Sequence, residues 1–79
     1  MNIQSRTEIG QDTIRVMLVD DDDRIQQALR LAIETHPELN LVGQAYTLKD
    51  AMAVVEELQP EVVLVDLGLP DGSGLELIA

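Results

Sequence analysis

Three short apolar segments alternate with two longer amphipathic segments along this chain. Residues 14–19 (IRVMLV) and 61–66 (EVVLVD) are nearly continuous runs of β-branched and aliphatic side chains, which is typical of strands buried on both faces of a sheet. Residues 39–45 (LNLVGQA) alternate between apolar and polar positions only in their first half, and they indicate a weaker strand. The pattern therefore predicts three strands.

The segment after the first strand has the periodicity of a helix. It is predicted to begin near Asp22 or Asp23, since either carboxylate can cap free N–H groups and complement the helix dipole, and to end at His36-Pro37. Apolar residues at helical spacing form its predicted inner face: Ile25, Ala28, Leu29, Ala32 and Ile33. The predicted outer face carries polar side chains: Gln26, Gln27, Arg30 and Glu34.

A second helix is predicted to start after Thr47, because Thr47 and Asp50 have the spacing of a capping box, and to close at Gln59-Pro60. Its predicted inner face is apolar: Leu48, Ala51, Met52, Val55 and Leu58. Residues 67–74 are rich in Pro and Gly and indicate a loop, and residues 75–79 are predicted to begin a third helix.

The order of strand, helix, strand, helix, strand and the start of a helix predicts an α/β fold. Crossovers between such strands are right-handed, so the strands should be parallel, with helices forming layers on the two faces of the sheet. If the second and third strands flank the first, their carboxyl ends border a topological switch point. Asp20, Asp21 and Asp66 would then converge there.

Composition narrows the classes of function. The 79 residues allow one small domain, and the 46% hydrophobic content suits a globular chain. A net charge of −10 and a single aromatic residue, Tyr46, argue against nucleic-acid contact by this segment. Without cysteine, thiolate metal sites are excluded. Residues 1–13 form a polar lead-in without a signal-peptide pattern, and the apolar runs are too short to span a membrane, so we expect a cytoplasmic protein.

Carboxylates gather directly after two of the predicted strands. Asp20 to Asp23 follow VMLV, and Asp66 follows VVLV. Carboxylates brought together without a basic partner repel one another, and Mg²⁺ is the cation that one or two carboxylates with water and phosphate oxygens hold best. The pattern predicts a magnesium site with a nucleophilic aspartate.

Simpler roles compete for several of these residues. Asp22 and Asp23 are better explained as helix caps, Asp71-Gly72 as a turn, His36 as a helix end, and Tyr46 as packing near the second helix. A calcium loop starting at Asp20 fails, because Ile25 and Leu31 occupy its Gly and Glu positions. The spacing of Asp20 and Asp22 is similar to that of haloacid-dehalogenase-like phosphatases, but Arg24 does not fit their pattern.

Two motifs together resemble a known family. Residues 18–21 (LVDD) and 65–76 (VDLGLPDGSGLE) resemble the receiver domain of two-component response regulators, which has a flavodoxin-like sheet of order 2-1-3-4-5. Residues 35–39 (THPEL) and 42–45 (VGQA) look most like receivers of the NarL/LuxR type, which carry a helix-turn-helix output domain. The resemblance covers residues 14–79 and implies a three-layer partial receiver with sheet order 2-1-3.

The resemblance implies a role for each matching residue. Asp66 would be the phosphoacceptor for a histidine kinase or phosphotransfer protein, and Asp20 and Asp21 would hold Mg²⁺ together with Asp66 and the backbone carbonyl of Gly68. Pro70 and Gly74 would shape the loop. The protein would be a substrate and switch in transcription control, and not an enzyme; a minimal metal-dependent phosphatase is a less favoured alternative.

The chain departs from the family pattern in its length. A complete receiver runs to roughly 120 residues, whereas this chain stops in its third helix, before the Ser or Thr of the fourth strand and the Lys of the fifth. Lys49 and Ser73 cannot replace them, since one lies in a helix and the other in the loop. An alternative function is therefore a receiver fragment that is not phosphorylated and acts as an interaction module. With the third strand as a bare sheet edge, we expect a homodimer of order 2-1-3-3′-1′-2′.

Overall fold

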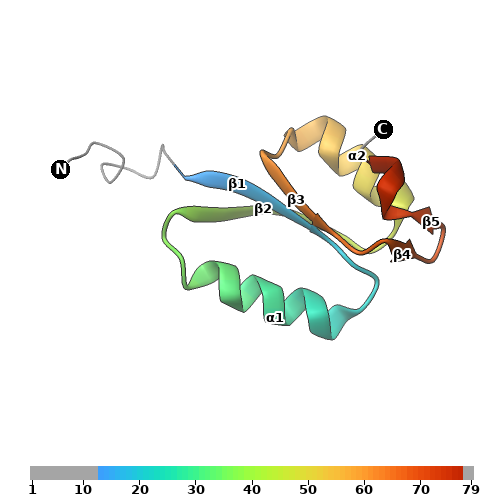
Figure 1. Ribbon diagram of the computed structural model, residues 1–79. Coiled ribbons are helices and arrows are strands. Elements are labelled where there is room, and N and C mark those ends of the chain that lie inside the picture. Colours follow the sequence, from blue (N-terminus) through green and yellow to red (C-terminus); the bar gives the residue numbers. More distant parts are fainter. Residues whose placement is uncertain (1–12, 78–79) are drawn as a thin grey trace.

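The computed structural model describes residues 13–77 (Figure 1). The polar lead-in predicted for residues 1–13 thus lies outside the described residues, apart from Thr13, as do the last two positions of the predicted third helix. The elements in chain order are β1 (Ile14–Val19), α1 (Asp23–Glu34), β2 (Leu39–Ala45), α2 (Leu48–Leu58), β3 (Val62–Val65), β4 (Gly68–Leu69), β5 (Gly72–Ser73) and a 3₁₀ helix (Gly74–Leu77).

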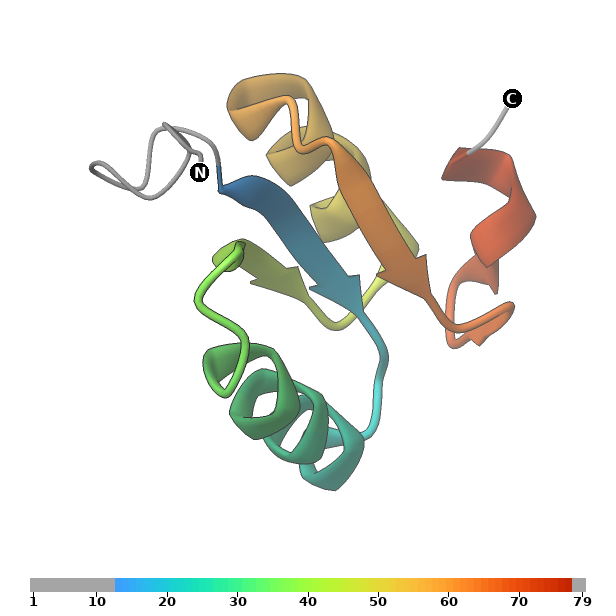
Figure 2. The same cartoon turned by 60° about the vertical axis from the view of Figure 1, so that its left-hand side comes forward.

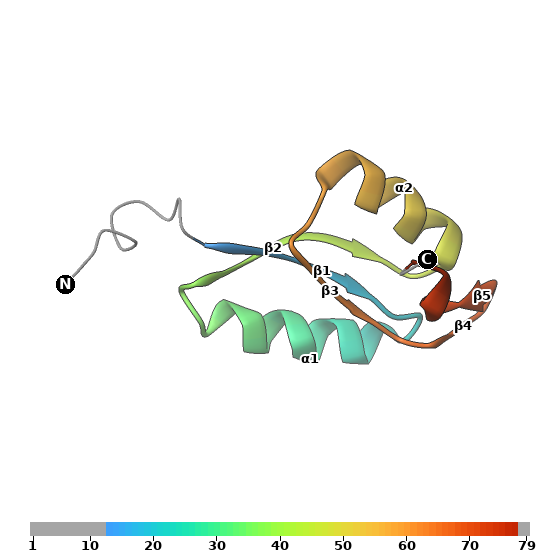
Figure 3. The same ribbon diagram turned by 45° about the horizontal axis from the view of Figure 1, so that its top comes forward.

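The main sheet confirms the predicted topology. β1 is central and pairs in parallel with β2 on one side and β3 on the other, so the order is β2-β1-β3. α1 covers one face and α2 covers the other, which gives three layers (Figures 1 and 3). Because parallel strands end at the same edge, the residues that follow β1 and β3 lie side by side.

Side chains of β1 alternate between two small cores, because successive residues of a strand point to opposite faces. On the α1 side, Val16 and Leu18 pack with Ile33. The core on the α2 side is larger and comprises Met17, Val19, Ala45, Leu48, Ala51 and Leu69. Met17 and Leu18 have no exposed surface at all. β1 is therefore buried on both faces, as its continuous apolar pattern predicts.

The predicted inner face of α1 is partly wrong. Leu29 and Ile33 pack against the sheet, but Ile25 is 45% exposed and Ala28 and Ala32 are exposed. Gln26, predicted on the outer face, is fully buried. The reason is that α1 lies over β2 and β1, so the side of its apolar stripe directed toward β3 has no covering element among residues 13–77. In α2, Met52 is likewise 44% exposed.

The segment after β3 differs from a simple loop and helix. β4 and β5 form a two-stranded antiparallel hairpin, and the residues after it form a 3₁₀ helix from Gly74 instead of an α-helix from Leu75. Figure 2 shows both beyond the end of β3. β3 itself is shorter than predicted and forms an edge of the sheet in the described part of the chain, with Val62 and Leu64 more than two-fifths exposed (41% and 43%).

Candidate functional site

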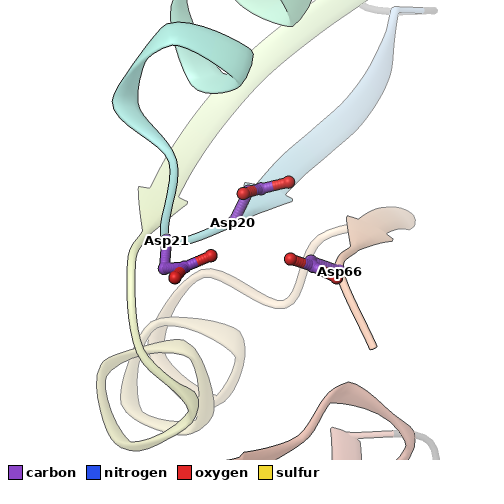
Figure 4. A group of neighbouring side chains, drawn as sticks. All are labelled: Asp20, Asp21 and Asp66. Carbon is purple, nitrogen blue, oxygen red and sulfur yellow. The ribbon is translucent and has the colours of Figure 1, made fainter. Parts of the chain in front are cut away.

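Three carboxylates meet at the carboxyl edge of the sheet. Asp20 and Asp21 directly follow β1, and Asp66 directly follows β3. One oxygen of each lies within 4.8 Å of the others, and the three side chains point toward a common space (Figure 4). Asp20 and Asp66 are half-buried and Asp21 is exposed. We call these three residues the acidic cluster.

Within residues 13–77, no basic side chain forms an ion pair with the acidic cluster. The ion pairs among residues 13–77 join Arg24 to Asp22, Arg30 to Glu34 and His36 to Glu38, and none of them reaches the cluster. Two like charges at such separations repel by about 1–4 kcal/mol, depending on the local dielectric. A small divalent cation would remove this repulsion, and an all-oxygen donor set with an exposed member suits Mg²⁺, which keeps several waters.

On the β1 side, the carboxylate of Asp20 is oriented by the start of α1. Its Oδ1 accepts a hydrogen bond from the backbone N–H of Asp22 at 2.9 Å, and its own N–H donates to the carbonyl of Ala45 at 3.1 Å. Asp22 is the N-cap of α1 and accepts from the N–H of Arg24. This confirms Asp22 as the cap and separates it from the acidic cluster.

On the β3 side, Asp66 is held at both its backbone and its side chain. Its N–H donates to the carbonyl of Val19 at 2.8 Å, and its Oδ1 accepts from the N–H of Gly68 at 3.0 Å. Among the described residues, no donor lies on Oδ2. The arrangement therefore leaves one carboxylate oxygen of Asp66 available to a ligand or to an electrophile.

Gly74 closes the loop behind Asp66. A Cβ at Gly74 would lie 2.4 Å from the carbonyl oxygen of Asp66 and 2.7 Å from a methyl of Val65. The N–H of Gly74 also donates to the carbonyl of Leu67 at 3.1 Å. No other residue type fits here without moving the backbone that carries Asp66, which gives a physical reason for glycine at this position.

Asp71 connects the loop to α2, a contact that sequence reasoning missed. It lies in the turn of the β4–β5 hairpin, as predicted, but its two oxygens also accept from the N–H groups of Leu48 (2.7 Å) and Lys49 (3.0 Å) at the start of α2. The hydrogen bond from Leu48, followed by that from Lys49, holds the pKa of Asp71 below its usual value. Thr47 caps the same helix through the N–H of Asp50, which confirms the predicted capping residue.

Gln26 is the second residue that sequence reasoning missed. It is the fully buried polar side chain of residues 13–77, and its Nε2 donates to the carbonyls of Asp20 (3.0 Å) and Ala45 (2.7 Å). Its Oε1 accepts from Nε2 of Gln44 at 2.8 Å. The signal was present in the spacing, because positions 26, 29 and 33 lie on one helical face.

Tyr46 is 40% exposed, and its hydroxyl donates to Oδ1 of Asp23 at 2.8 Å, a partner in α1 that the sequence prediction did not include. This hydrogen bond, together with some desolvation and the nearby negative charge of Asp23, raises the pKa of Tyr46 above its usual value. The contact ties the β2–α2 connection to the first turn of α1. Asp23 thus links α1 to the β2–α2 connection and does not belong to the acidic cluster.

The sequence matches proteins of signal transduction. The model of the response regulator receiver domain matches residues 16–79. The transcriptional regulatory protein YdfI of Bacillus subtilis is 39% identical over 64 residues, which are 81% of this chain and 30% of that protein. The DNA-binding transcriptional activator DevR/DosR of Mycobacterium tuberculosis is 41% identical over 64 residues, with the same coverage. Other relatives are named protein-glutamate methylesterases, as in Agrobacterium fabrum.

Solved structures agree with this match. A LuxR-family two-component response regulator from Aurantimonas superposes with a TM-score of 0.77 at 35% identity, covering 82% of this chain and 46% of that one. The response regulator domain of CheB from Thermotoga maritima gives 0.79 at 32% identity, covering 84% and 49%. The chain spans about half of these structures and less than a third of the curated relatives.

The helices in the described part of the chain lack the length and apolar character needed to cross a membrane. The topology β2-β1-β3, the position of the acidic cluster at the strand ends and the match over residues 16–79 agree with one another. The chain belongs to the response regulator receiver domain family of two-component signalling systems.

Proposed function

We propose that Asp66 accepts a phosphoryl group from the phosphohistidine of a histidine kinase or phosphotransfer protein, in a reaction that depends on Mg²⁺. The observation that carries the proposal is the acidic cluster itself: three carboxylates within 4.8 Å, with no basic partner among the described residues, in a chain of the receiver family. Asp20, Asp21, Asp66 and the backbone carbonyl of Gly68 would hold the ion. When bound, Mg²⁺ would neutralise charge on the carboxylates and on the phosphoryl oxygens.

The chemistry of the step follows from the free oxygen of Asp66. Oδ2 forms the new bond to phosphorus, the phosphorus–nitrogen bond of phosphohistidine breaks, and the imidazole leaves with the electron pair and takes up a proton. The product is a mixed anhydride on Asp66. The N–H of Gly68 holds Oδ1, so the attacking oxygen is fixed relative to the loop. Positioning and charge stabilisation account for most of the catalysis in phosphoryl transfer. Here the N–H of Gly68 would contribute to positioning, and the bound Mg²⁺ would supply the charge stabilisation.

The chain would act as a substrate and switch, with one phosphoryl group for each molecule. The relatives YdfI, a transcriptional regulatory protein, and DevR/DosR, a DNA-binding transcriptional activator, support transcription as the controlled process. In that case a longer protein would carry the output function. A place in the cytoplasm goes with the proposed histidine kinase partner and with membership of the receiver family. A phosphatase, by contrast, would release phosphate steadily and would not stop at a stoichiometric product.

The test is phosphoryl labelling from a histidine kinase and from a small acyl-phosphate donor, with and without Mg²⁺. We expect up to one phosphoryl group per chain in Mg²⁺, little without it, and none in Asp66→Asn. Asp50→Asn is the matched control, since it makes the same change at an exposed carboxylate of α2, outside the acidic cluster. Labelling that persists in Asp66→Asn would contradict Asp66 as the acceptor, and labelling that ignores Mg²⁺ would contradict the metal site.

A second candidate function rests on β3. Its outward edge is unpaired in the described part of the chain, and Val62 and Leu64 are exposed beside it. A second copy of the chain pairing along this edge would extend the sheet to the order 2-1-3-3′-1′-2′. We would measure the solution mass by sedimentation: a folded particle of 8.7 kDa at micromolar concentration would rule the dimer out. A dimer that takes no phosphoryl label would favour an interaction module over a phosphoacceptor.

A further inference from the structure

Gln26 is unusual because it places a primary amide where the structure otherwise has apolar side chains. It has no exposed surface, whereas most of α1 around it is exposed. Burying an amide is costly unless its hydrogen bonds are made. All the hydrogen bonds of this amide are directed to residues of β2 and to the end of β1.

The orientation of the amide is determined by its partners. Two backbone carbonyls, of Asp20 and Ala45, face one end of it, and carbonyls can only accept. That end must therefore be the NH₂ group, which has two hydrogens to donate. The oxygen at the other end, Oε1, accepts a hydrogen bond from Nε2 of Gln44. Every donor and acceptor that points into the interior is satisfied, and the side chain has one arrangement.

These bonds connect the three elements that meet behind the acidic cluster. The Ala45 carbonyl accepts from the N–H of Asp20, which joins the ends of β1 and β2 directly. Gln26 of α1 joins them a second time, because its Nε2 donates to the carbonyls of both Asp20 and Ala45. The Asp20 carbonyl is held by Gln26, while its carboxylate Oδ1 accepts from Asp22. The main chain at Asp20 is thus fixed from both sides before the chain turns to expose Asp21.

We propose that Gln26 is a positioning residue of the metal site: its buried amide fixes the backbone of Asp20 and thereby places the carboxylates of Asp20 and Asp21. The inference rests on the proposed function, because it concerns the same site. The polar side-chain atoms of Gln26 are hydrogen-bonded to Asp20, Ala45 and Gln44, so Gln26 would not be a ligand of the ion. Groups that orient metal ligands change metal affinity by about 10- to 100-fold when removed, and Gln26 acts in this way through the main chain.

The test is Mg²⁺ titration followed by calorimetry and by amide resonances, at a temperature where all variants are folded. Gln26→Met fills the same volume without hydrogen bonds, and we expect the Kd for Mg²⁺ to rise about tenfold. The resonances of Asp20 and Asp21 should shift more than those of Asp66 and Gly68. Ile33→Val is the matched control, because it weakens the same helix two turns away without touching Asp20. It should change the Kd less than about twofold.

Each outcome decides between the claims. If the unmodified protein does not bind Mg²⁺, the proposed function fails and this inference fails with it. If the unmodified protein binds and Gln26→Met binds equally well, only the role of Gln26 is overturned. An equal loss in Ile33→Val would show that the effect is general destabilisation. Should Gln26→Met not fold, the exposed Gln44→Met replaces it: a weaker affinity supports the proposal and an unchanged affinity overturns it.

Discussion

The two sides of the acidic cluster are fixed in different ways. On the β1 side, a buried neutral amide, Gln26, joins the ends of two strands to α1. On the β3 side, an exposed carboxylate, Asp71, connects the loop after Asp66 to the start of α2. The first connection depends on packing and hydrogen-bond geometry, and the second depends on charge.

The two kinds of connection suit different requirements on the two sides of the acidic cluster. The residues predicted to hold the ion on the β1 side need a constant position, and a satisfied buried network provides it. Under the proposed function, the loop that carries Asp66 and Gly68 would accommodate a new phosphoryl group, and an exposed contact can adjust at lower cost. The contrast can be tested by altering one side at a time.

The largest effect on the free energy of unfolding is expected on the β3 side, where Gly74 lies against the backbone of Asp66. Gly74→Ala places a Cβ 2.4 Å from the carbonyl oxygen of Asp66, so the backbone must move. We expect the free energy of unfolding to fall by about 3 kcal/mol, as in severe overpacking. Gly68→Ala is the control, because its Cβ would meet only the Asp66 carboxylate at 3.9 Å. Chemical denaturation measures both; equal stabilities would contradict the role given to Gly74.

The next effect is expected on the β1 side. Gln26→Met leaves the carbonyl of Asp20 and the amide of Gln44 without the partners they have now, and we expect a loss of about 2 kcal/mol in the free energy of unfolding. Gln27→Met, at the exposed neighbouring position, should change it much less. If the two substitutions cost the same in urea denaturation, the buried network does not stabilise the fold.

A smaller effect, sensitive to salt and pH, is expected for Asp71→Asn. The pKa of Asp71 is lowered in the folded chain, so its contribution is fully present above the unfolded pKa of about 4 and is lost as the pH falls through the folded pKa. The stability difference from the unmodified protein should therefore be present at pH 7 and vanish in acid. The control is Asp50→Asn in the first turn of α2. It removes an equal charge but leaves intact the two hydrogen bonds that Asp71 accepts from the start of this helix. An identical pH profile for Asp50→Asn would refute a specific contact.

The smallest effect is expected for Tyr46→Phe, which removes the hydrogen bond to Asp23 at the surface. The pKa of Tyr46 is raised, so the contribution of its hydroxyl is present below the unfolded pKa of about 10 and is lost as the pH rises through the folded pKa. Thermal unfolding between pH 7 and 11 should show the two proteins converging at the alkaline end. If the difference in stability between the two proteins grew with pH, the pKa of Tyr46 would be lowered by folding, which would contradict the hydrogen bond to Asp23 as the cause.

The sequence was sufficient for the three strands of the main sheet, the helices α1 and α2, the parallel order and the meeting of Asp20, Asp21 and Asp66, because each depends on periodicity or on where parallel strands end. It was insufficient for Gln26 and Asp71. Polar character placed Gln26 outside, whereas tertiary hydrogen bonds decide its burial. The contact of Asp71 joins residues 23 positions apart and depends on how the hairpin folds back on α2.

The central position of β1 also determines which parts of the site open first. Met17 and Leu18 are fully buried and β1 has a partner strand on each side, whereas β3 is paired on one side in the described part of the chain. We therefore expect β1 to open only when the whole domain unfolds. Backbone amides that open locally exchange their hydrogens faster with solvent. Asp20 and Asp21 thus extend from the central strand of the described sheet, while Asp66 extends from an edge strand, whose amides we expect to exchange faster. Asp66, the proposed acceptor, would consequently be the carboxylate of the acidic cluster whose backbone opens most readily.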